Sequence, residues 1–278
     1  MDFDGGYIGF TTGQLHNYVK TRSKKVILER DHGGPMQGKM IDDGVASLVC
    51  DSKCFDLIHI DPWRQHKHFA SGLQKTEELI ATCLSNGFSG LFEIGTEQSI
   101  REFSLEELRD LSNYLSDYPV KYLVIQSGTS LNENKNTGLY DARKLKAFTD
   151  LAFKFGWLSK EHNGDYLEPS LVRSKFSLGL NAINIAPEFG FYESSCYLEI
   201  IGPNTKLLDR FYEICYDSNQ WKKWVSKEFD VRNKTKLIEV CGHYILESND
   251  FIKNIKNHLP DISMAIKNRI KHKISEIS

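Results

Sequence analysis

The chain is organised around the stretch Val26-Ile-Leu-Glu-Arg-Asp-His-Gly-Gly-Pro35. Its apolar start fits a short buried strand, and the Gly-Gly-Pro that closes it cannot continue a strand. An acid and a histidine, Asp31 and His32, therefore stand where the strand ends. The same design, an apolar run closed by ionisable residues, recurs along the chain, and this recurrence predicts the fold.

Apolar runs that fit strands occur in seven places. They cover residues 26–30, 57–61, 91–97, 122–129, 158–163, 181–190 and 237–243. Helical patterns separate most of them, with apolar residues at every third or fourth position and capping boxes that begin at Thr11 and Ser104. Alternation of this kind requires right-handed crossovers and a parallel sheet.

The sequence predicts an α/β fold, namely a closed (β/α)8 TIM barrel rather than an open doubly wound sheet. No GxGxxG or Walker loop follows a strand, and reactive side chains end many strands instead of gathering at one switch point. A complete barrel needs eight strands, so the first is either missing or replaced by Tyr7–Phe10. We expect a single domain over residues 1–278, in which 205–278 adds C-terminal helices around the last strand.

Composition excludes several classes of protein. The chain has 278 residues, a net charge of −2 and 26% charged residues, which gives no general attraction to nucleic acid or to a membrane surface. Its six cysteines contain no CxxC pair, so reduced thiols are expected. Because the sequence shows no apolar targeting segment, we expect a cytoplasmic protein. We also expect a homodimer, since barrels of this size often pair through their helical layers.

Ionisable residues end the predicted strands, and in a barrel these ends meet at one mouth. Imidazoles with carboxylates can hold a divalent cation, and a nearby carboxylic group can then move a proton. The candidate metal ligands are His32, His162, Glu93 and His243, and the candidate acid or base groups are Asp31, Glu161 and Asp61.

Other roles remain open for some of these residues. Asp31 could accept hydrogen bonds from the glycine amides that follow it and serve only the turn. His162 fits a ligand or a buried, hydrogen-bonded histidine equally well. Since His59 alternates with apolar neighbours, we expect a structural role for it and regard Asp61 as the better candidate at that strand.

Residues at or after the ends of two predicted strands could bind an anionic group of a substrate. The loop 127–136 combines backbone amides, hydroxyls and a lysine, which suits an anion site but also an ordinary polar loop. The candidate substrate-binding residues are Gly128, Thr129, Ser130, Asn184 and Glu188.

Several segments resemble successive landmarks of the non-catalytic-type (Z) subunit of class II tagatose-bisphosphate aldolases. They are Gly5–Thr11, Ile27–Pro35, Ile58–Asp61 and Glu93–Glu97, with Glu161–Tyr166 and Ala186–Gly190 resembling a divergent branch. The resemblance implies a fold similar to that of the zinc-dependent class II aldolases, with zinc as the metal. It also implies that Asp31 is the acid or base, that His32 binds the metal, and that a catalytic aldolase subunit is a possible partner.

The leading hypothesis is a metal-dependent, aldolase-like carbon–carbon lyase that acts on a sugar phosphate or a related carbohydrate. One alternative is a non-catalytic accessory subunit that stabilises a class II aldolase partner. The other is a metal-free isomerase or epimerase of sugar phosphates that uses paired carboxylates such as Glu93 and Glu161.

Overall fold

The computed structural model describes residues 10–37, 42–203 and 205–277, and the chain divides into two compact units. Unit 1 consists of Met1–Gly128, Leu139–His162 and Lys175–Ile183, and unit 2 consists of Thr129–Gly138, Asn163–Ser174 and Asn184–Ser278. The assignment of a single domain to 1–278 stays a prediction.

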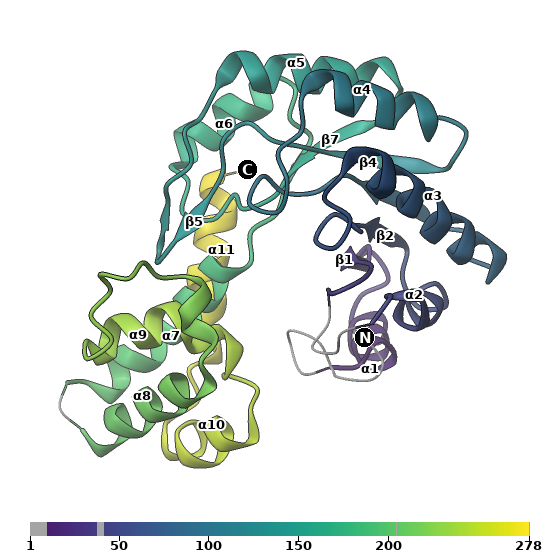
Figure 1. Cartoon of the computed structure of the whole chain (residues 1–278). Helices are drawn as coiled ribbons and strands as arrows, with labels where there is room; N and C mark the ends of the chain where they lie inside the picture. The colour runs from purple at the N-terminus through teal and green to yellow at the C-terminus, as the bar shows by residue number, and fades with distance from the viewer. Residues whose placement is uncertain (1–9, 38–41, 204, 278) are drawn as a thin grey trace. The chain divides into compact units, whose positions relative to one another are not determined.

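Unit 1 contains a six-stranded parallel sheet (Figure 1). In spatial order, its strands are β1 (Glu29–Gly33), β2 (Leu57–Ile60), β3 (Leu91–Ile94), β4 (Val120–Ile125), β7 (Leu158–Glu161) and β8 (Ala182–Ile183). The strand order follows the chain order, as expected when each strand is joined to the next by a crossover connection. The predicted alternation of strands and helices around a parallel sheet is confirmed for this unit.

Helices precede and connect the strands of unit 1. They are α1 (Thr12–Lys20), α2 (Val45–Asp51), α3 (Phe69–Ser85), α4 (Leu105–Tyr114) and α5 (Ala142–Lys154), while α6 (Pro169–Ser177) is divided between the two units. Both predicted capping boxes are present: Thr11 and Gln14 cap α1, and Ser104 and Glu107 cap α4. Figure 1 shows α3, α4 and α5 following one side of the sheet.

The core of unit 1 lies between the sheet and these helices. Apolar side chains of the strands pack against apolar stripes of the helices. Burial of apolar surface stabilises the folded state by roughly 25 cal/mol per Å². The fully buried members include Ile58, Ile60, Phe92, Ile94, Leu123, Leu79, Ile80, Leu108, Leu111 and Leu145.

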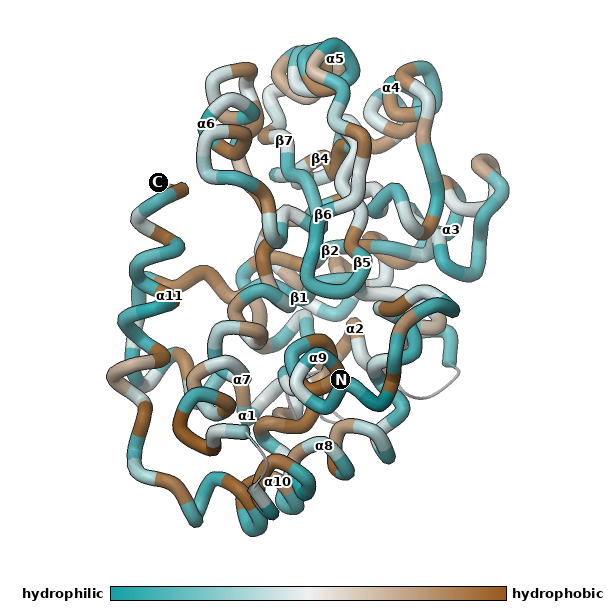
Figure 2. Tube along the Cα trace, turned by 90° about the vertical axis from the view of Figure 1, so that its left-hand side faces the viewer, coloured by the Kyte–Doolittle hydropathy of each residue, from teal (hydrophilic) through white to brown (hydrophobic). Residues whose placement is uncertain are grey.

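Unit 2 is mainly helical. It contains the antiparallel hairpin β5 (Leu131–Asn132) and β6 (Lys135–Asn136), then α7 (Pro187–Ile201), α8 (Lys206–Ser218), α9 (Lys234–Cys241), α10 (Asn249–Asn254) and α11 (Ser263–Ile277), with short 3-10 helices at Gln220–Lys223, Gly242–Tyr244 and Lys256–His258. The hairpin is largely hydrophilic, whereas hydrophobic and hydrophilic residues alternate along α8 (Figure 2). The buried core of this unit includes Phe211, Leu237, Ile238, Phe251 and Ile255.

The prediction of a closed eight-stranded TIM barrel is wrong. Among the described residues the parallel sheet has six strands and is open. The run 181–190 supplies only the two-residue strand β8, because Pro187 begins α7. The stand-in strand proposed at Tyr7–Phe10 lies largely outside the described residues, since 7–9 are not described.

The strand predicted at 237–243 is also wrong, because this segment is helical. Asn233 accepts a hydrogen bond from the Lys236 N–H and caps α9. The buried residues that follow lie at positions 237, 238, 240 and 241, a spacing that gives one face of a helix. Burial of that face against the core of unit 2 decides the conformation.

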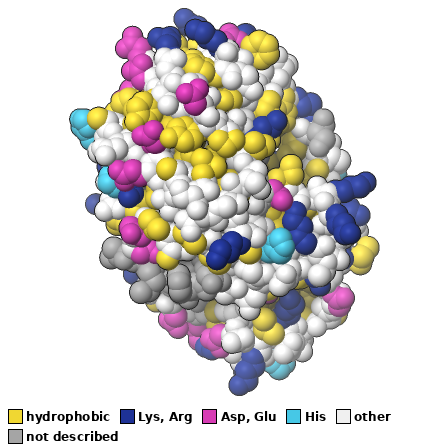
Figure 3. Space-filling view, turned by 90° about the vertical axis from the view of Figure 1, so that its right-hand side faces the viewer, with side chains coloured by type: hydrophobic (Ala, Val, Ile, Leu, Met, Phe, Trp, Pro, Cys, Tyr) yellow, Lys and Arg dark blue, Asp and Glu magenta, His cyan; other side chains and the backbone are white. Residues whose placement is uncertain are grey.

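No helix in the described ranges is long and apolar enough to cross a membrane. Some large apolar side chains are nevertheless exposed, among them Leu139 and Phe153. On the face drawn in Figure 3, hydrophobic side chains gather in patches between charged ones.

A buried aspartate holds the start of α7 in unit 2. Asp165 Oδ1 accepts hydrogen bonds from the N–H groups of Ala186 (2.8 Å) and Glu188 (2.9 Å). Burial, together with the charge of Glu188, raises the pKa of Asp165 to about 6. An unfolded aspartate has a pKa of about 3.9, so the folded protein binds this proton more tightly. The contribution of protonated Asp165 to the free energy of unfolding is fully present below about pH 4 and is lost as the pH rises through 6.

We predict that Asp165→Asn becomes relatively more stable as the pH rises. The asparagine oxygen can accept both hydrogen bonds, and the variant has no buried charge at neutral pH. Between pH 5 and pH 7.5 the difference in unfolding free energy should shift in favour of the variant by about 1 kcal/mol, since one pKa unit corresponds to about 1.4 kcal/mol. Urea denaturation at both pH values measures this difference, and an unchanged difference would contradict the prediction.

Candidate metal centre

A bulge in β1 brings two adjacent side chains to one place. The register with β2 shifts between Arg30 and Gly33, where β1 has one residue more than its partner. The residues at the bulge are Asp31 and His32, and His32 has a φ of 47°. In a regular strand, neighbouring side chains point to opposite faces, whereas a bulge re-aims a side chain. The bulge therefore lets Asp31 and His32 contribute to the same site.

The turn after the bulge passes close to the end of β2. A Cβ atom on Gly34, whose φ is 152°, would lie 2.7 Å from the carbonyl oxygen of Asp61. Only glycine allows this approach without a shift of the backbone. The close passage keeps the β1 bulge beside Asp61.

Asp31, His32, His59 and His162 form a cluster in unit 1. Each offers one ligand atom, and these four atoms lie within 4.8 Å of one another. The three imidazole rings are evenly spaced, with centroids 4.9 to 5.0 Å apart. The side chains of His59 and His162 are buried, that of His32 is 21% exposed and that of Asp31 is 55% exposed. The cluster is therefore closed around the histidines and open to solvent at Asp31.

One ring nitrogen of each histidine lies at hydrogen-bond distance from a fixed oxygen. The pairs are His32 Nδ1 with Asp61 Oδ2 (2.6 Å), His59 Nε2 with the carbonyl of Gly95 (3.0 Å) and His162 Nε2 with Glu93 Oε1 (2.7 Å). Such an oxygen draws the N–H to its own side of the ring and turns the lone pair of the other nitrogen toward the cluster. Metal-bound histidines in proteins are oriented in this way. At His59 this lone pair also accepts the His32 N–H at 3.2 Å, a hydrogen bond that a metal ion on His59 would replace.

The charges around the cluster create a negative potential. Burial lowers the pKa of His32, but Asp31 and Asp61 raise it more, to about 10. Burial also lowers the pKa of His59, yet its net shift is upward, mainly because of Glu93. For Asp31, partial loss of hydration raises the pKa, but the three histidines lower it more, well below its ordinary value. The upward shifts of the two histidines show that the surrounding carboxylates favour positive charge at the cluster, and the downward shift of Asp31 keeps its carboxylate negative; both conditions suit a bound cation.

A buried ammonium group lies beside the cluster. Lys160 on β7 donates to both carboxylate oxygens of Glu29 (2.6 and 2.8 Å) and to Glu93 Oε2 (2.6 Å). Burial and the charge of Glu93 raise the pKa of Glu29 to about 8. Burial also raises the pKa of Glu93, but His59, His162 and Lys160 reverse this and lower it. Glu93 is therefore the carboxylate that carries negative charge next to His162.

The donor set fits a divalent transition metal. Imidazole nitrogens and a carboxylate oxygen are ligands that zinc and similar ions accept, at about 2.0 to 2.2 Å. Four such atoms within 4.8 Å of one another need only small shifts to surround one ion. The buried cluster can therefore bind a metal.

Three predicted site residues lie together, and sequence reasoning missed a fourth. Asp31, His32 and His162 share the cluster, although they were predicted from separate strands. His59 was expected to be structural, yet it belongs to the same cluster. The signal that could have identified it is its spacing from Asp61: residues two apart on a strand lie on the same face.

Glu93 and Asp61 lie immediately behind the histidines. Glu93, predicted as a metal ligand, contacts His162 and Lys160. Asp61, predicted as an acid or base, accepts hydrogen bonds from the Thr96 hydroxyl (3.0 Å) and contacts His32. Their predicted roles as ligand and as proton donor or acceptor stay predictions.

Glu161 belongs to a separate buried ion pair. Its Oε2 lies 2.6 Å from Lys175 Nζ, and its Oε1 accepts hydrogen bonds from the N–H (2.7 Å) and hydroxyl (2.6 Å) of Ser127. Because adjacent residues of a strand point to opposite faces, Glu161 and Lys160 lie on different sides of β7. The predicted role of Glu161 as an acid or base stays a prediction.

The predicted anion loop is divided between the units. Gly128 ends a segment of unit 1 with a φ of 95°, and a Cβ there would lie 1.9 Å from the carbonyl oxygen of Leu139. Thr129 is buried, and the Ser130 N–H donates to Asn136 Oδ1 at 3.3 Å. The glycine is required by the close approach of the chain, and the role of these residues in substrate binding stays a prediction.

The remaining candidates lie in unit 2. The Asn184 carbonyl accepts a hydrogen bond from the N–H of Gly164 at 2.9 Å. Buried Glu188 accepts from the Tyr166 N–H (2.7 Å) and pairs with Lys273 (2.8 Å). These contacts hold segments of unit 2 together, and the predicted contacts of Asn184 and Glu188 with a substrate stay predictions.

His243 lies in a 3-10 helix of unit 2 rather than in a strand. Burial, helped by the charge of Lys223, lowers its pKa to about 3. Its ring lies 4.2 Å from that of Tyr244 between centroids. His243 is thus a neutral, packed imidazole, and its role as a metal ligand stays a prediction.

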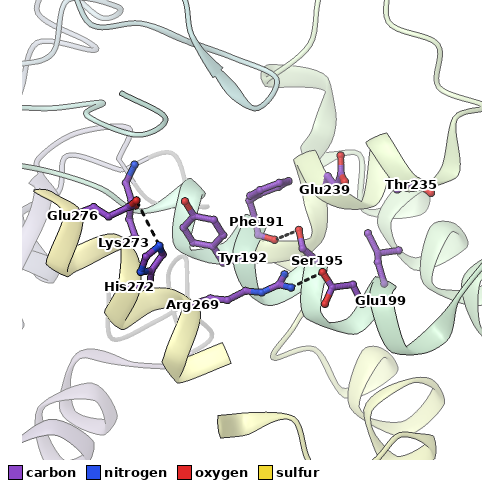
Figure 4. A pocket seen from close by; sticks show the side chains of 11 residues that line it. Phe191, Tyr192, Ser195, Glu199, Thr235, Glu239, Arg269, His272, Lys273 and Glu276 are labelled. Atoms are coloured by element: carbon purple, nitrogen blue, oxygen red, sulfur yellow. Dashed lines mark hydrogen bonds and ion pairs between the residues drawn. The ribbon is translucent and has the colours of Figure 1, made fainter. Parts of the chain in front are cut away.

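A pocket of about 610 Å³ is lined by side chains of α7, α9 and α11 in unit 2 (Figure 4). Several of its charged side chains are paired within the protein. The pairs are Arg269 with Glu199, His272 with Glu276 (3.5 Å) and Lys273 with Glu188 (2.8 Å). No residue of the histidine cluster lines this pocket, so the pocket and the candidate metal site are separate.

The structure is similar to those of proteins that handle sugars. A probable tagatose 6 phosphate kinase from Sinorhizobium meliloti 1021 matches with a TM-score of 0.73 and 16% identity, over 92% of this chain and 76% of that one. The fructuronate-tagaturonate epimerase UxaE from Cohnella laeviribosi matches with a TM-score of 0.59 and 10% identity, over 93% and 69%. At these identities the likeness establishes a shared fold alone. No family model and no curated protein matches the sequence.

We predict that Lys175→Met destabilises the protein strongly, because it leaves the Glu161 carboxylate buried without its ammonium partner. Loss of one partner of a buried pair costs about 3–5 kcal/mol. The double variant Glu161→Gln, Lys175→Met should recover much of that loss, since no charge is then stranded. Urea denaturation of the three proteins measures both effects. Equal stability of the two variants would contradict a structural role for this pair.

Proposed function

We propose that the chain is a metal-dependent enzyme of carbohydrate metabolism, an aldolase-like carbon–carbon lyase that acts on a sugar phosphate. The observation that carries the proposal is the cluster of three histidines and Asp31, in which each imidazole has an oxygen partner behind it. The fold neighbours named for tagatose 6 phosphate and for sugar acids support a carbohydrate as the substrate.

We assign the metal to His32, His59 and His162, and we propose zinc as the ion. Three histidines with one open coordination position are a common arrangement in catalytic zinc sites. The surrounding carboxylates also support a cation, because the net pKa shifts of His32 and His59 are both upward. A divalent cation bound there would act as a Lewis acid toward a carbonyl or hydroxyl oxygen of the substrate.

We assign proton transfer to Asp31. Its side chain is 55% exposed, whereas the histidines are mostly buried, so it lies on the open side of the cluster. Its Oδ1 lies 3.9 Å from His32 Nε2 and 3.5 Å from His59 Nδ1. A carboxylate at this position can take a proton from, or return it to, a substrate held at the metal.

The first test is metal content. Protein purified without a histidine tag should contain, or take up, about one divalent ion per chain, and His59→Ala or His162→Ala should abolish this binding. The loss should exceed the roughly 10–100-fold that removal of a ligand's hydrogen-bond partner typically causes. Elemental analysis and competition with a chelator provide the measurements. His258→Ala, on an exposed residue of unit 2, is the control and should bind the metal normally.

The second test separates proton transfer from metal binding. Asp31→Asn should lower carbon–carbon bond cleavage by about 10²–10⁴-fold, the usual contribution of a general acid or base, while metal affinity falls far less than in His59→Ala. A panel of ketose phosphates, assayed for release of the aldehyde fragment with and without chelator, measures activity. A loss of metal as severe as in His59→Ala would make Asp31 a ligand. Failure of the metal-loaded protein to cleave any ketose phosphate would count against a lyase.

An epimerase of a sugar acid or sugar phosphate is the second candidate. The observation in its favour is the fold likeness to the fructuronate-tagaturonate epimerase. A metal-free epimerase would use Glu93 and Glu161 as its acid and base. These two carboxylates contact different lysines, Lys160 and Lys175, so they do not share one ion pair. NMR analysis of products distinguishes the candidates: an epimerase inverts one centre, whereas a lyase yields two fragments. Activity that survives chelation would favour the metal-free mechanism.

A further inference from the structure

We propose that Lys160 is a positioning residue for the metal centre: by anchoring the carboxylate of Glu93, it fixes the ring of His162 and so sets the affinity of the cluster for a divalent cation. This inference rests on the proposed function, because it takes the cluster to be a metal site.

The contacts form a continuous path from the lysine to the cluster. Lys160 and His162 are two residues apart and point to the same side of the chain. Glu93 lies between them and uses one oxygen for each: Oε2 accepts from Lys160 Nζ (2.6 Å), and Oε1 lies 2.7 Å from His162 Nε2. The side chains of Glu93 and His162 are 0% and 3% exposed, so water does not compete for these contacts.

The ammonium group is held in place on its other side as well. Lys160 donates to both oxygens of Glu29, at 2.6 and 2.8 Å, in addition to Glu93. An ammonium has three N–H donors, and three carboxylate oxygens surround this one. Lys160 is therefore a fixed cation and not a nucleophile. Since Glu29 precedes the β1 bulge, the same group ties the strands that carry Asp31 and His162 to each other.

Removal of the lysine would change how His162 is held. Glu93 Oε2 would lose the donor that now lies 2.6 Å from it, and no ammonium would remain between Glu93 and Glu29. The Glu93 carboxylate would then be free to turn away from its present position. That change weakens the acceptor that holds the N–H on Nε2 of His162. The ring could then rotate or change tautomer, and the nitrogen that faces the cluster would no longer be fixed.

The test compares Lys160→Met with Lys175→Met. Both changes remove a buried ammonium that pairs with a buried glutamate in unit 1, but only the first one touches Glu93. Zinc affinity is measured by competition with a chromogenic chelator at a temperature where both variants are folded, as checked by circular dichroism. Lys160→Met should bind zinc about 10–100-fold more weakly than the unmodified protein, the range observed when a ligand loses its hydrogen-bond partner. Lys175→Met should keep its affinity within about threefold.

Nitrogen NMR of the histidine rings gives a readout that does not depend on activity. In the unmodified protein, the N–H of His162 should be on Nε2, whereas Lys160→Met should show a mixture of tautomers. Glu93→Gln provides a second variant in case Lys160→Met does not fold. Its amide oxygen can still accept from His162 but has no charge, so its zinc affinity should fall by about tenfold, the lower end of the same range.

The outcomes separate this inference from the proposed function. The positioning role is overturned if the unmodified protein binds zinc and Lys160→Met binds it equally tightly. Where Lys160→Met does not fold, the same comparison is made with Glu93→Gln. In either case the proposal of a metal site is unaffected. Equal weakening by Lys160→Met and Lys175→Met would also overturn the positioning role, because the loss would then reflect general destabilisation. Failure of the unmodified protein to bind any divalent metal would overturn the proposed function, and this inference with it.

Discussion

The bulge in β1 is the constraint on which the site depends. It places Asp31 and His32 in one cluster, and it does so with His32 in the left-handed region at a φ of 47°. Such a conformation costs on the order of 1–3 kcal/mol and persists only where the surroundings impose it. Two contacts do so here: the His32 N–H donates to His59 Nδ1 at 3.2 Å, and the ring contacts Asp61 at 2.6 Å. The cluster and the bulge therefore require each other.

The two sides of the sheet in unit 1 carry different kinds of side chain. The side toward the helices supplies most of the apolar burial, through residues such as Ile58, Ile60, Phe92 and Ile94. The other side carries ionisable residues: His59 and Glu93 at the alternate positions of those two strands, with Glu29 on β1 and Lys160 on β7. On β2 and β3, a period of two thus separates the apolar core from the ionisable side chains. The polar side remains folded because its charges are paired with one another, so that few of them are buried alone.

The sequence predicted the local features of unit 1 well, because they depend on neighbouring residues. Capping boxes at Thr11 and Ser104 and apolar runs between polar loops are short-range signals. It failed at 237–243, where a short apolar run fits a strand or a buried helix and the core of unit 2 decides. His59 was missed for another reason. Its spacing from Asp61 places it on the same side of β2, but its membership of the cluster also depends on the register between β1 and β2 and on the β1 bulge, which the residues around it do not show.

Lys160 and Glu161 are adjacent on β7, and each belongs to a buried lysine–glutamate pair. The two pairs have different roles. The Glu161–Lys175 pair also holds Ser127, and so it joins the sheet to the end of α6 and to the segment after β4. A buried pair is weak evidence for stability, since apolar residues of similar volume often stabilise as well or better. The contribution of the Lys160–Glu93 pair is therefore best sought in geometry. Apolar side chains could fill the same space, but they could not hold a charged acceptor behind His162, and the direction of that imidazole depends on such an acceptor.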